Sequence, residues 1–87
     1  MHDLELLMVF PTTHLTLSAE RTLEKAGIEH RTVMRPRRIS SDCGLAIRID
    51  AQSLDACREA LAAEGSRPVR FFMQVNGEWE YIEEPGA

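Results

Sequence analysis

The stretch Leu4-Glu5-Leu6-Leu7-Met8-Val9-Phe10 is almost continuously apolar and is closed by Pro11. A short apolar run of this kind predicts a strand that is buried on both faces in the centre of a sheet. Thr12 or Thr13 can cap a following helix, because a threonine oxygen accepts from the free N–H groups of a first helical turn. Gly27 is the expected left-handed stop of that helix. Its apolar residues recur at helical spacing: Leu15, Ala19, Leu23 and Ala26.

The middle of the chain predicts two more strands and a second helix. One strand runs from about His30 to Arg35, where Pro36 ends it, and the next covers Gly44 to Ile49. Asp50 or Ser53 is expected to cap the helix, which ends at Gly65. Its apolar stripe consists of Leu54, Cys57 and Leu61.

The last part of the chain predicts a β-hairpin. Residues 71–75 and 78–82 flank Asn76-Gly77, a pair typical of type I′ turns because both central residues need positive φ. The two-residue loop pairs Val75 with Glu78 and Phe71 with Ile82. Both faces of this hairpin are partly apolar, which suggests a second buried surface and a homodimer contact through the hairpin.

These elements predict one α+β domain spanning residues 1–87. The order β-α-β-β-α-β suggests a ferredoxin-like sandwich with both helices on one face, an added C-terminal hairpin strand (hairpin extension 69–83) and a short tail (84–87). The 87-residue length, 44% hydrophobic content and 28% charged content fit a small globular domain.

Charge and targeting features narrow the function classes. A net charge of −4 argues against a general nucleic-acid binder. The absence of a charged N-terminal leader and of a long apolar run predicts a cytoplasmic protein without a membrane span, whose two cysteines stay reduced. The three histidines are scattered, so no metal site is expected, and the sequence has no phosphate-loop or dinucleotide motif that would predict a cofactor.

The most reactive position predicted from the sequence is Cys43. It precedes Gly44 at the end of a loop in which residues 31–48 carry five arginines against one acid, Asp42. Backbone freedom, partial exposure and nearby positive charge lower the pKa of a thiol, whereas Asp42 opposes ionisation. A small apolar residue that begins a strand is the competing interpretation of Cys43.

The stretch Pro36-Arg37-Arg38-Ile39-Ser40-Ser41-Asp42-Cys43-Gly44, preceded by Phe10-Pro11-Thr12-Thr13-His14, resembles the Se/S carrier protein-like family of small bacterial domains. The resemblance covers about the first two-thirds of the chain. Asp42 departs from the small uncharged residue of many relatives, and the acidic hairpin after Val69 is longer than the usual ending.

The resemblance implies a sulfur or selenium carrier that holds a persulfide or selenopersulfide on Cys43 and exchanges it with donor and acceptor proteins. Arg37, Ser40, Ser41 and Gly44 would bind the anion or leave its approach path open. Thr13, His14 and Arg38 are secondary candidates, although a solvated loop is favoured for Arg38 and Arg35. Whether the protein is an enzyme stays open.

Two alternatives to the carrier remain at this stage. One is a non-catalytic module that binds an anion or a protein through the arginine-rich loop 35–48, and the other is a dimerising interaction domain. A Cys43–His14 dyad is not expected, because the predicted topology places the start of the first helix and the start of the third strand at opposite ends of the sheet.

Overall fold

The computed structural model describes residues 4–39, 43–65 and 70–82. The chain forms an α+β fold with two helices and a five-stranded antiparallel sheet, in the strand order β2-β3-β1-β4-β5. The elements are β1 (Glu5–Val9), α1 (Thr13–Lys25), β2 (Arg31–Met34), β3 (Leu45–Asp50), a 3₁₀ turn (Ala51–Ser53), α2 (Leu54–Ala63), β4 (Arg70–Val75) and β5 (Glu78–Ile82).

Strand β1 occupies the centre of the sheet, as the apolar run predicts. It pairs with β3 on one side and with β4 on the other. Its residues from Leu6 to Val9, and Phe10 after it, are at most 3% exposed. A strand buried on both faces cannot alternate between apolar and polar residues, which explains the continuous apolar run.

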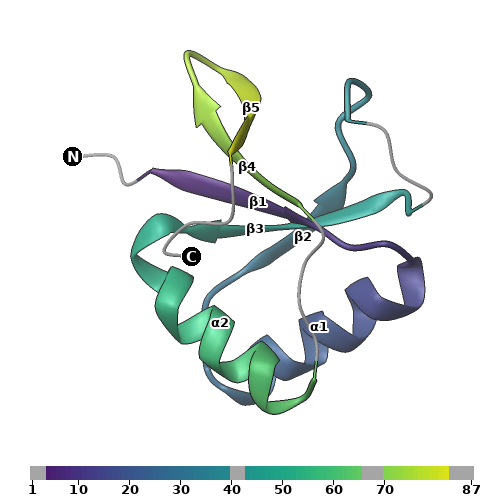
Figure 1. The fold of residues 1–87 in the computed structure, drawn as a ribbon, viewed down its shortest axis with the longest axis vertical. Helices are drawn as coiled ribbons and strands as arrows, with labels where there is room; N and C mark the ends of the chain where they lie inside the picture. The colour runs from purple at the N-terminus through teal and green to yellow at the C-terminus, as the bar shows by residue number, and fades with distance from the viewer. Residues whose placement is uncertain (1–3, 40–42, 66–69, 83–87) are drawn as a thin grey trace.

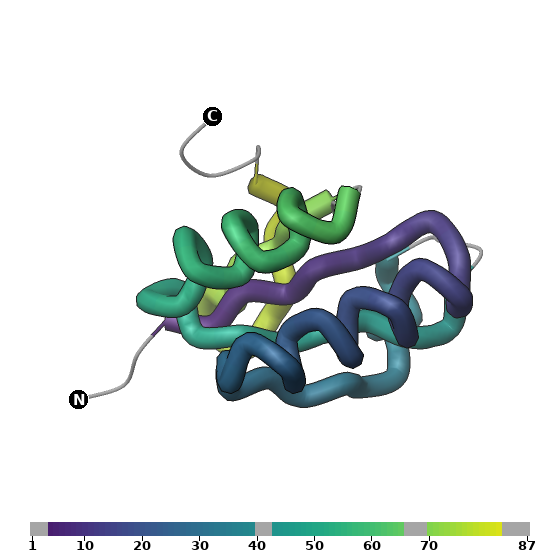
Figure 2. The backbone as a smooth tube through the Cα atoms, turned by 90° about the horizontal axis from the view of Figure 1, so that it is seen from below, coloured from purple at the N-terminus to yellow at the C-terminus, as the bar shows by residue number. Residues whose placement is uncertain are grey.

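Both helices cover the same face of the sheet (Figures 1 and 2). The main core lies between them and the sheet, where β1 contributes Leu6 and Met8, α1 contributes Leu23 and α2 contributes Cys57 and Leu61. Thr12 caps α1 by accepting a hydrogen bond from the Leu15 N–H at 3.1 Å, which confirms one of the two predicted caps. Asp50 and Ser53 make no side-chain cap bond; instead, the 3₁₀ turn leads into α2.

The hairpin forms with the predicted register. Phe71 pairs with Ile82 and Val75 with Glu78. Asn76 and Gly77 have φ angles of 51° and 82°, as a turn with two left-handed residues requires.

A second apolar cluster covers the sheet face away from the helices. Here Ile39, from the loop after β2, and Trp79, from β5, pack over residues of the sheet. The turn of the hairpin and the loop after β2 both project on this side (Figure 1). The sheet residues of the cluster are Leu7, Val9, Val33, Ala46 and Phe72. The second surface predicted from the hairpin is therefore packed within the chain.

Within residues 4–39, 43–65 and 70–82, neither helix is long and apolar enough to cross a membrane.

The second cluster makes the loop after β2 part of the fold. Ile39 is 4% exposed, so truncating it in an Ile39→Ala variant leaves a cavity and should lower the free energy of unfolding by roughly 2 to 4 kcal/mol. Met34 is 82% exposed, so Met34→Ala should change the free energy of unfolding by less than about 0.5 kcal/mol. Urea unfolding measures both; equal effects would mean that Ile39 does not pack on the sheet.

Candidate functional site

The first turn of α1 and the start of β3 lie at the same end of the sheet. The antiparallel register pairs Met8 with Ile47, so β3 begins beside the point where β1 ends and the chain turns into α1 (Figure 1). The sequence-based expectation that these two starts lie at opposite ends is wrong. Neighbouring antiparallel strands run in opposite directions, so the end of one always lies beside the start of the other.

Cys43 lies two residues before β3 and is fully buried, with 0% of its surface exposed. The predicted partial exposure is therefore wrong. Thr13 donates a hydrogen bond to the sulfur at 3.6 Å, and the Thr16 hydroxyl lies 3.1 Å from it. The backbone of Leu45 contributes both an N–H donor and a carbonyl acceptor at 3.3 Å. The sulfur thus lies among polar groups beside the N-terminal turn of a helix.

The pKa of the Cys43 thiol is lowered from its ordinary value. Burial is the largest single influence and raises the pKa, since it penalises the charged form. Hydrogen bonds from Thr16, from Thr13 and from the Leu45 backbone, together with the positive charge of Arg35, outweigh that effect. The N-terminal end of a helix also favours negative charge. The site therefore favours a thiolate without exposing it to solvent.

Arg35 holds the chain around Cys43 in place. Its Nε donates to the Cys43 carbonyl at 2.9 Å, and its terminal nitrogen donates to the carbonyls of Pro36, at 3.4 Å, and of Ile39. Its backbone N–H also donates to the Gly44 carbonyl at 2.8 Å. Arg35 is half-buried, so the interpretation of a solvated loop arginine is wrong for this residue.

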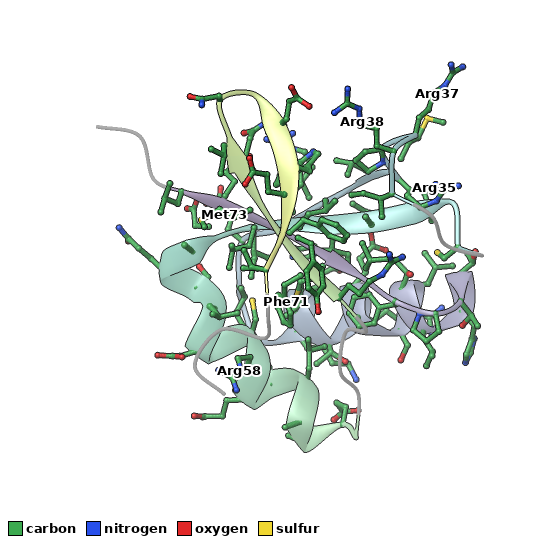
Figure 3. All side chains as sticks on the ribbon, turned by 45° about the horizontal axis from the view of Figure 1, so that its top comes forward. Arg35, Arg37, Arg38, Arg58, Phe71 and Met73 are labelled. Carbon is green, nitrogen blue, oxygen red and sulfur yellow. The ribbon has the colours of Figure 1, made fainter. Side chains whose placement is uncertain are left out.

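Arg37 and Arg38 are exposed and point outward from the loop, whereas Arg35 lies next to the start of β3 (Figure 3). Arg38 forms an ion pair with Glu78 of the hairpin. Between the loop and the hairpin lies a shallow groove of about 330 Å³ lined by Pro36, Arg37, Arg38, Ile39, Gly77, Glu78 and Trp79.

The remaining candidates occupy different surroundings. Gly44 is exposed, and a Cβ atom added there would meet nothing within 4 Å, so its side of the chain is open. His14 is exposed on the first turn of α1. Ser40 and Ser41, together with Asp42, lie outside the described residues.

Cys57 contrasts with Cys43. It is buried in the main core between α2 and the sheet, as its place on the apolar stripe predicts. Burial raises the pKa of its thiol to about 11. Among the residues that the structure describes, no group of three or more histidine, cysteine or acidic side chains could hold a metal ion.

Sequence reasoning missed Thr16 and the role of Arg35. Thr16 is fully buried on the stripe that also carries Ala19 and Leu23, so a polar residue at an apolar position was the available signal. The contacts of Arg35 with carbonyl groups depend on the path of the loop, and no spacing rule predicts that path.

These observations define a small α+β protein with one buried thiol whose ionisation is favoured by hydroxyl and backbone donors. A family model described as Putative Se/S carrier protein-like matches residues 5–72, and the chain belongs to this family. The match extends beyond the cysteine loop through α2 to the start of β4. No curated protein and no solved structure matches the chain.

The two thiols should ionise in different pH ranges. In a Cys57→Ala variant the remaining Cys43 should form thiolate at a lower pH than free cysteine does, because its hydrogen-bond donors favour the anion. In a Cys43→Ser variant the remaining Cys57 should ionise only near pH 11. Thiolate ultraviolet absorbance measures both; a Cys43 titration at or above that of free cysteine would contradict the assignment.

The two thiols should make the free energy of unfolding change with pH in opposite directions. The raised pKa of Cys57 contributes stability that is complete below its unfolded value near 9.0 and is lost as the pH rises through about 11. The lowered pKa of Cys43 contributes stability above its own unfolded value that is lost as the pH falls through its folded value. Urea unfolding from pH 8 to 11 should therefore show a smaller alkaline loss for Cys57→Ala than for the unmodified protein.

Replacing Arg35 with lysine should destabilise the protein even though the positive charge is kept. Lysine lacks the planar fork that reaches several carbonyls at once, so Arg35→Lys should lower the free energy of unfolding by roughly 1 to 2 kcal/mol. Arg37→Lys is the matched control at an exposed position and should change it by less than about 0.5 kcal/mol. Equal stabilities in urea would show that Arg35 does not hold the loop.

Proposed function

We propose that the protein carries sulfur or selenium as a persulfide or selenopersulfide on Cys43. The observation that carries this proposal is the set of hydrogen-bonding groups around the Cys43 sulfur: the Thr13 hydroxyl and the Leu45 N–H donate to it, and the Thr16 hydroxyl lies 3.1 Å away. Membership of the Se/S carrier protein-like family supports the same function. The proposal includes a ferredoxin-like framework with β5 added at its edge, with which the strand order β2-β3-β1-β4-β5 agrees.

The transfer needs no external oxidant. The Cys43 thiolate attacks the outer sulfur or selenium of a donor persulfide, a bond forms between that atom and the Cys43 sulfur, and the donor leaves as its thiolate. In the second step the nucleophile of an acceptor attacks the carried atom, and Cys43 leaves as a thiolate. Both steps exchange one bond for another, so atoms and electrons balance.

The surrounding residues have distinct roles in this proposal. Arg35 contributes positive charge and fixes the main chain at Cys43, while the hydroxyl donors stabilise the anionic sulfur. Gly44 leaves an open approach. Ser40 and Ser41 remain proposed as further donors to the carried atom, and Arg37 remains proposed as an anion-binding residue at the rim.

Burial of Cys43 makes protein partners a natural part of the proposal. The exposed Thr13 contacts the buried sulfur directly, and the exposed Gly44 follows Cys43 in the chain. A donor or acceptor protein that contacts these exposed residues would lie close to the thiol. We place the exchange in the cytoplasm, where a thiol stays reduced between transfers.

Two other interpretations receive less support. A module that binds an anion through the loop would depend mainly on the exposed Arg37, because Arg35 donates to main-chain carbonyls and Arg38 pairs with Glu78. A homodimer through the hairpin was suggested by its two apolar faces. Trp79 and Phe72 pack in the second cluster, and Met73 and Ile82 pack against the main core, so the hairpin needs no second copy to cover them.

Loading with a persulfide donor tests the carrier function. The reduced protein is incubated with a low-molecular-weight persulfide, the donor is removed, and intact mass is measured with peptide mapping. We expect one added sulfur atom on Cys43 in the unmodified protein and in Cys57→Ala, and none in Cys43→Ser. The carried sulfur should then pass to an added acceptor thiol and restore the original mass.

Other results of the same experiment contradict the proposal. Modification of Cys57 rather than Cys43 would show that Cys43 is not the thiol that accepts sulfur. An unmodified wild-type protein under conditions that load a free cysteine peptide would show that Cys43 does not accept sulfur. A low-molecular-weight selenopersulfide, R–S–Se⁻, which leaves as its thiolate R–S⁻, is used in parallel and compares selenium with sulfur on the same site.

A further inference from the structure

The Thr16 hydroxyl has two hydrogen-bond partners, the Thr12 carbonyl and the Cys43 sulfur, but only one proton to donate. It is fully buried, and its hydroxyl oxygen is 3.0 Å from the Thr12 carbonyl oxygen and 3.1 Å from the Cys43 sulfur. A threonine hydroxyl has one O–H donor and two acceptor lone pairs. The direction of these two hydrogen bonds therefore depends on where the thiol proton is.

In the thiol form both bonds can be made at once. The Cys43 S–H donates to the Thr16 oxygen or to the Leu45 carbonyl, and the Thr16 hydroxyl donates to the Thr12 carbonyl. In the thiolate form the sulfur can only accept. An unrotated Thr16 would then direct a lone pair at the anion, which is unfavourable at 3.1 Å in a buried site.

Rotation of the Thr16 hydroxyl removes this conflict. The hydroxyl then donates to the sulfur, and the Thr12 carbonyl still accepts the helical hydrogen bond from the Thr16 N–H at 3.0 Å. The helix thus keeps its backbone bond in both forms. Rotation about one side-chain bond needs no movement of the backbone.

From this geometry we infer that Thr16 is a proton-direction switch for Cys43: its hydroxyl accepts from the thiol and donates to the thiolate. In the proposed carrier cycle, on which this role in transfer rests, the switch acts most strongly when Cys43 is the leaving group. A thiolate that is better stabilised leaves faster, while its nucleophilicity falls. Thr16 should therefore favour release of the carried atom over its capture.

Thr13 provides a matched comparison on the same turn. Its hydroxyl also donates to the sulfur, but at 3.6 Å and from an exposed residue. Water can replace that donor, whereas a fully buried Thr16 has no such substitute. Removal of the two hydroxyls should therefore have unequal effects.

The direct test is a thiolate titration in the Cys57→Ala background. Thr16→Val and Thr16→Ala both remove the hydroxyl and should raise the Cys43 pKa by about one unit, a roughly tenfold fall in its acid constant. Thr16→Ser restores the hydroxyl and should bring the pKa back near the starting value. Thr13→Val should have a smaller effect than Thr16→Val. Circular dichroism and urea unfolding confirm that each variant is folded before titration.

A Thr16→Val pKa equal to that of the parent protein would overturn the inference, and so would a Thr16→Ser value as high as that of Thr16→Val. The second readout is the ratio of the two transfer rates at a pH where Cys43 is fully ionised in every variant. Thr16→Val should slow release to an acceptor thiol several-fold while leaving capture unchanged or faster. An equal slowing of both steps would contradict the leaving-group role.

The carrier function and the switch can fail separately. Absence of persulfide loading in the folded wild-type protein would reject the carrier function, although the titration would still measure the proton switch. Normal loading with a Thr16-independent pKa would keep the carrier function and reject the switch.

Discussion

The antiparallel pairing of β1 with β3 is the constraint on which the site depends. It places the chain before β3 beside the turn from β1 into α1, so the thiol of Cys43 meets the hydroxyls of Thr13 and Thr16. A slip of one residue would exchange the side chains that β1 turns toward the helices, Leu6 and Met8, with those it turns toward the second cluster. The geometry of the thiol therefore follows from the register of β1 and β3.

The arginines of the loop divide into structural and surface roles. Arg35 satisfies main-chain carbonyls around Cys43 and also contributes the positive charge that favours its ionisation. Ile39 then ties the same loop to the sheet through the second apolar cluster. Arg37 and Arg38 are exposed at the surface of the loop. One arginine thus serves the fold and the thiol together.

The sequence predicted those features that depend on a few neighbouring residues. The apolar run of β1, the Thr12 cap and the Asn76-Gly77 turn were predicted correctly, because burial, capping and positive φ each depend on few residues. The full burial of Cys43 and its contact with Thr16 were not predicted. They depend on how α1, β3 and the loop meet, which is a property of tertiary packing that periodicity does not carry.

Burial opposes ionisation of Cys43, so a buried thiolate needs stabilising contacts that an exposed thiolate does not. Desolvation alone would keep Cys43 protonated and unreactive, as it does for Cys57, where burial is the cause of the raised pKa. The difference between the two cysteines is the set of donors: Cys57 packs in the apolar main core, whereas Cys43 lies against hydroxyls and a backbone N–H. Such donors favour the anion although Cys43 is fully buried. For the proposed carrier, this combination would make exchange with small thiols slower than exchange with partners that can open the site, so burial becomes a source of selectivity while the thiolate stays reactive.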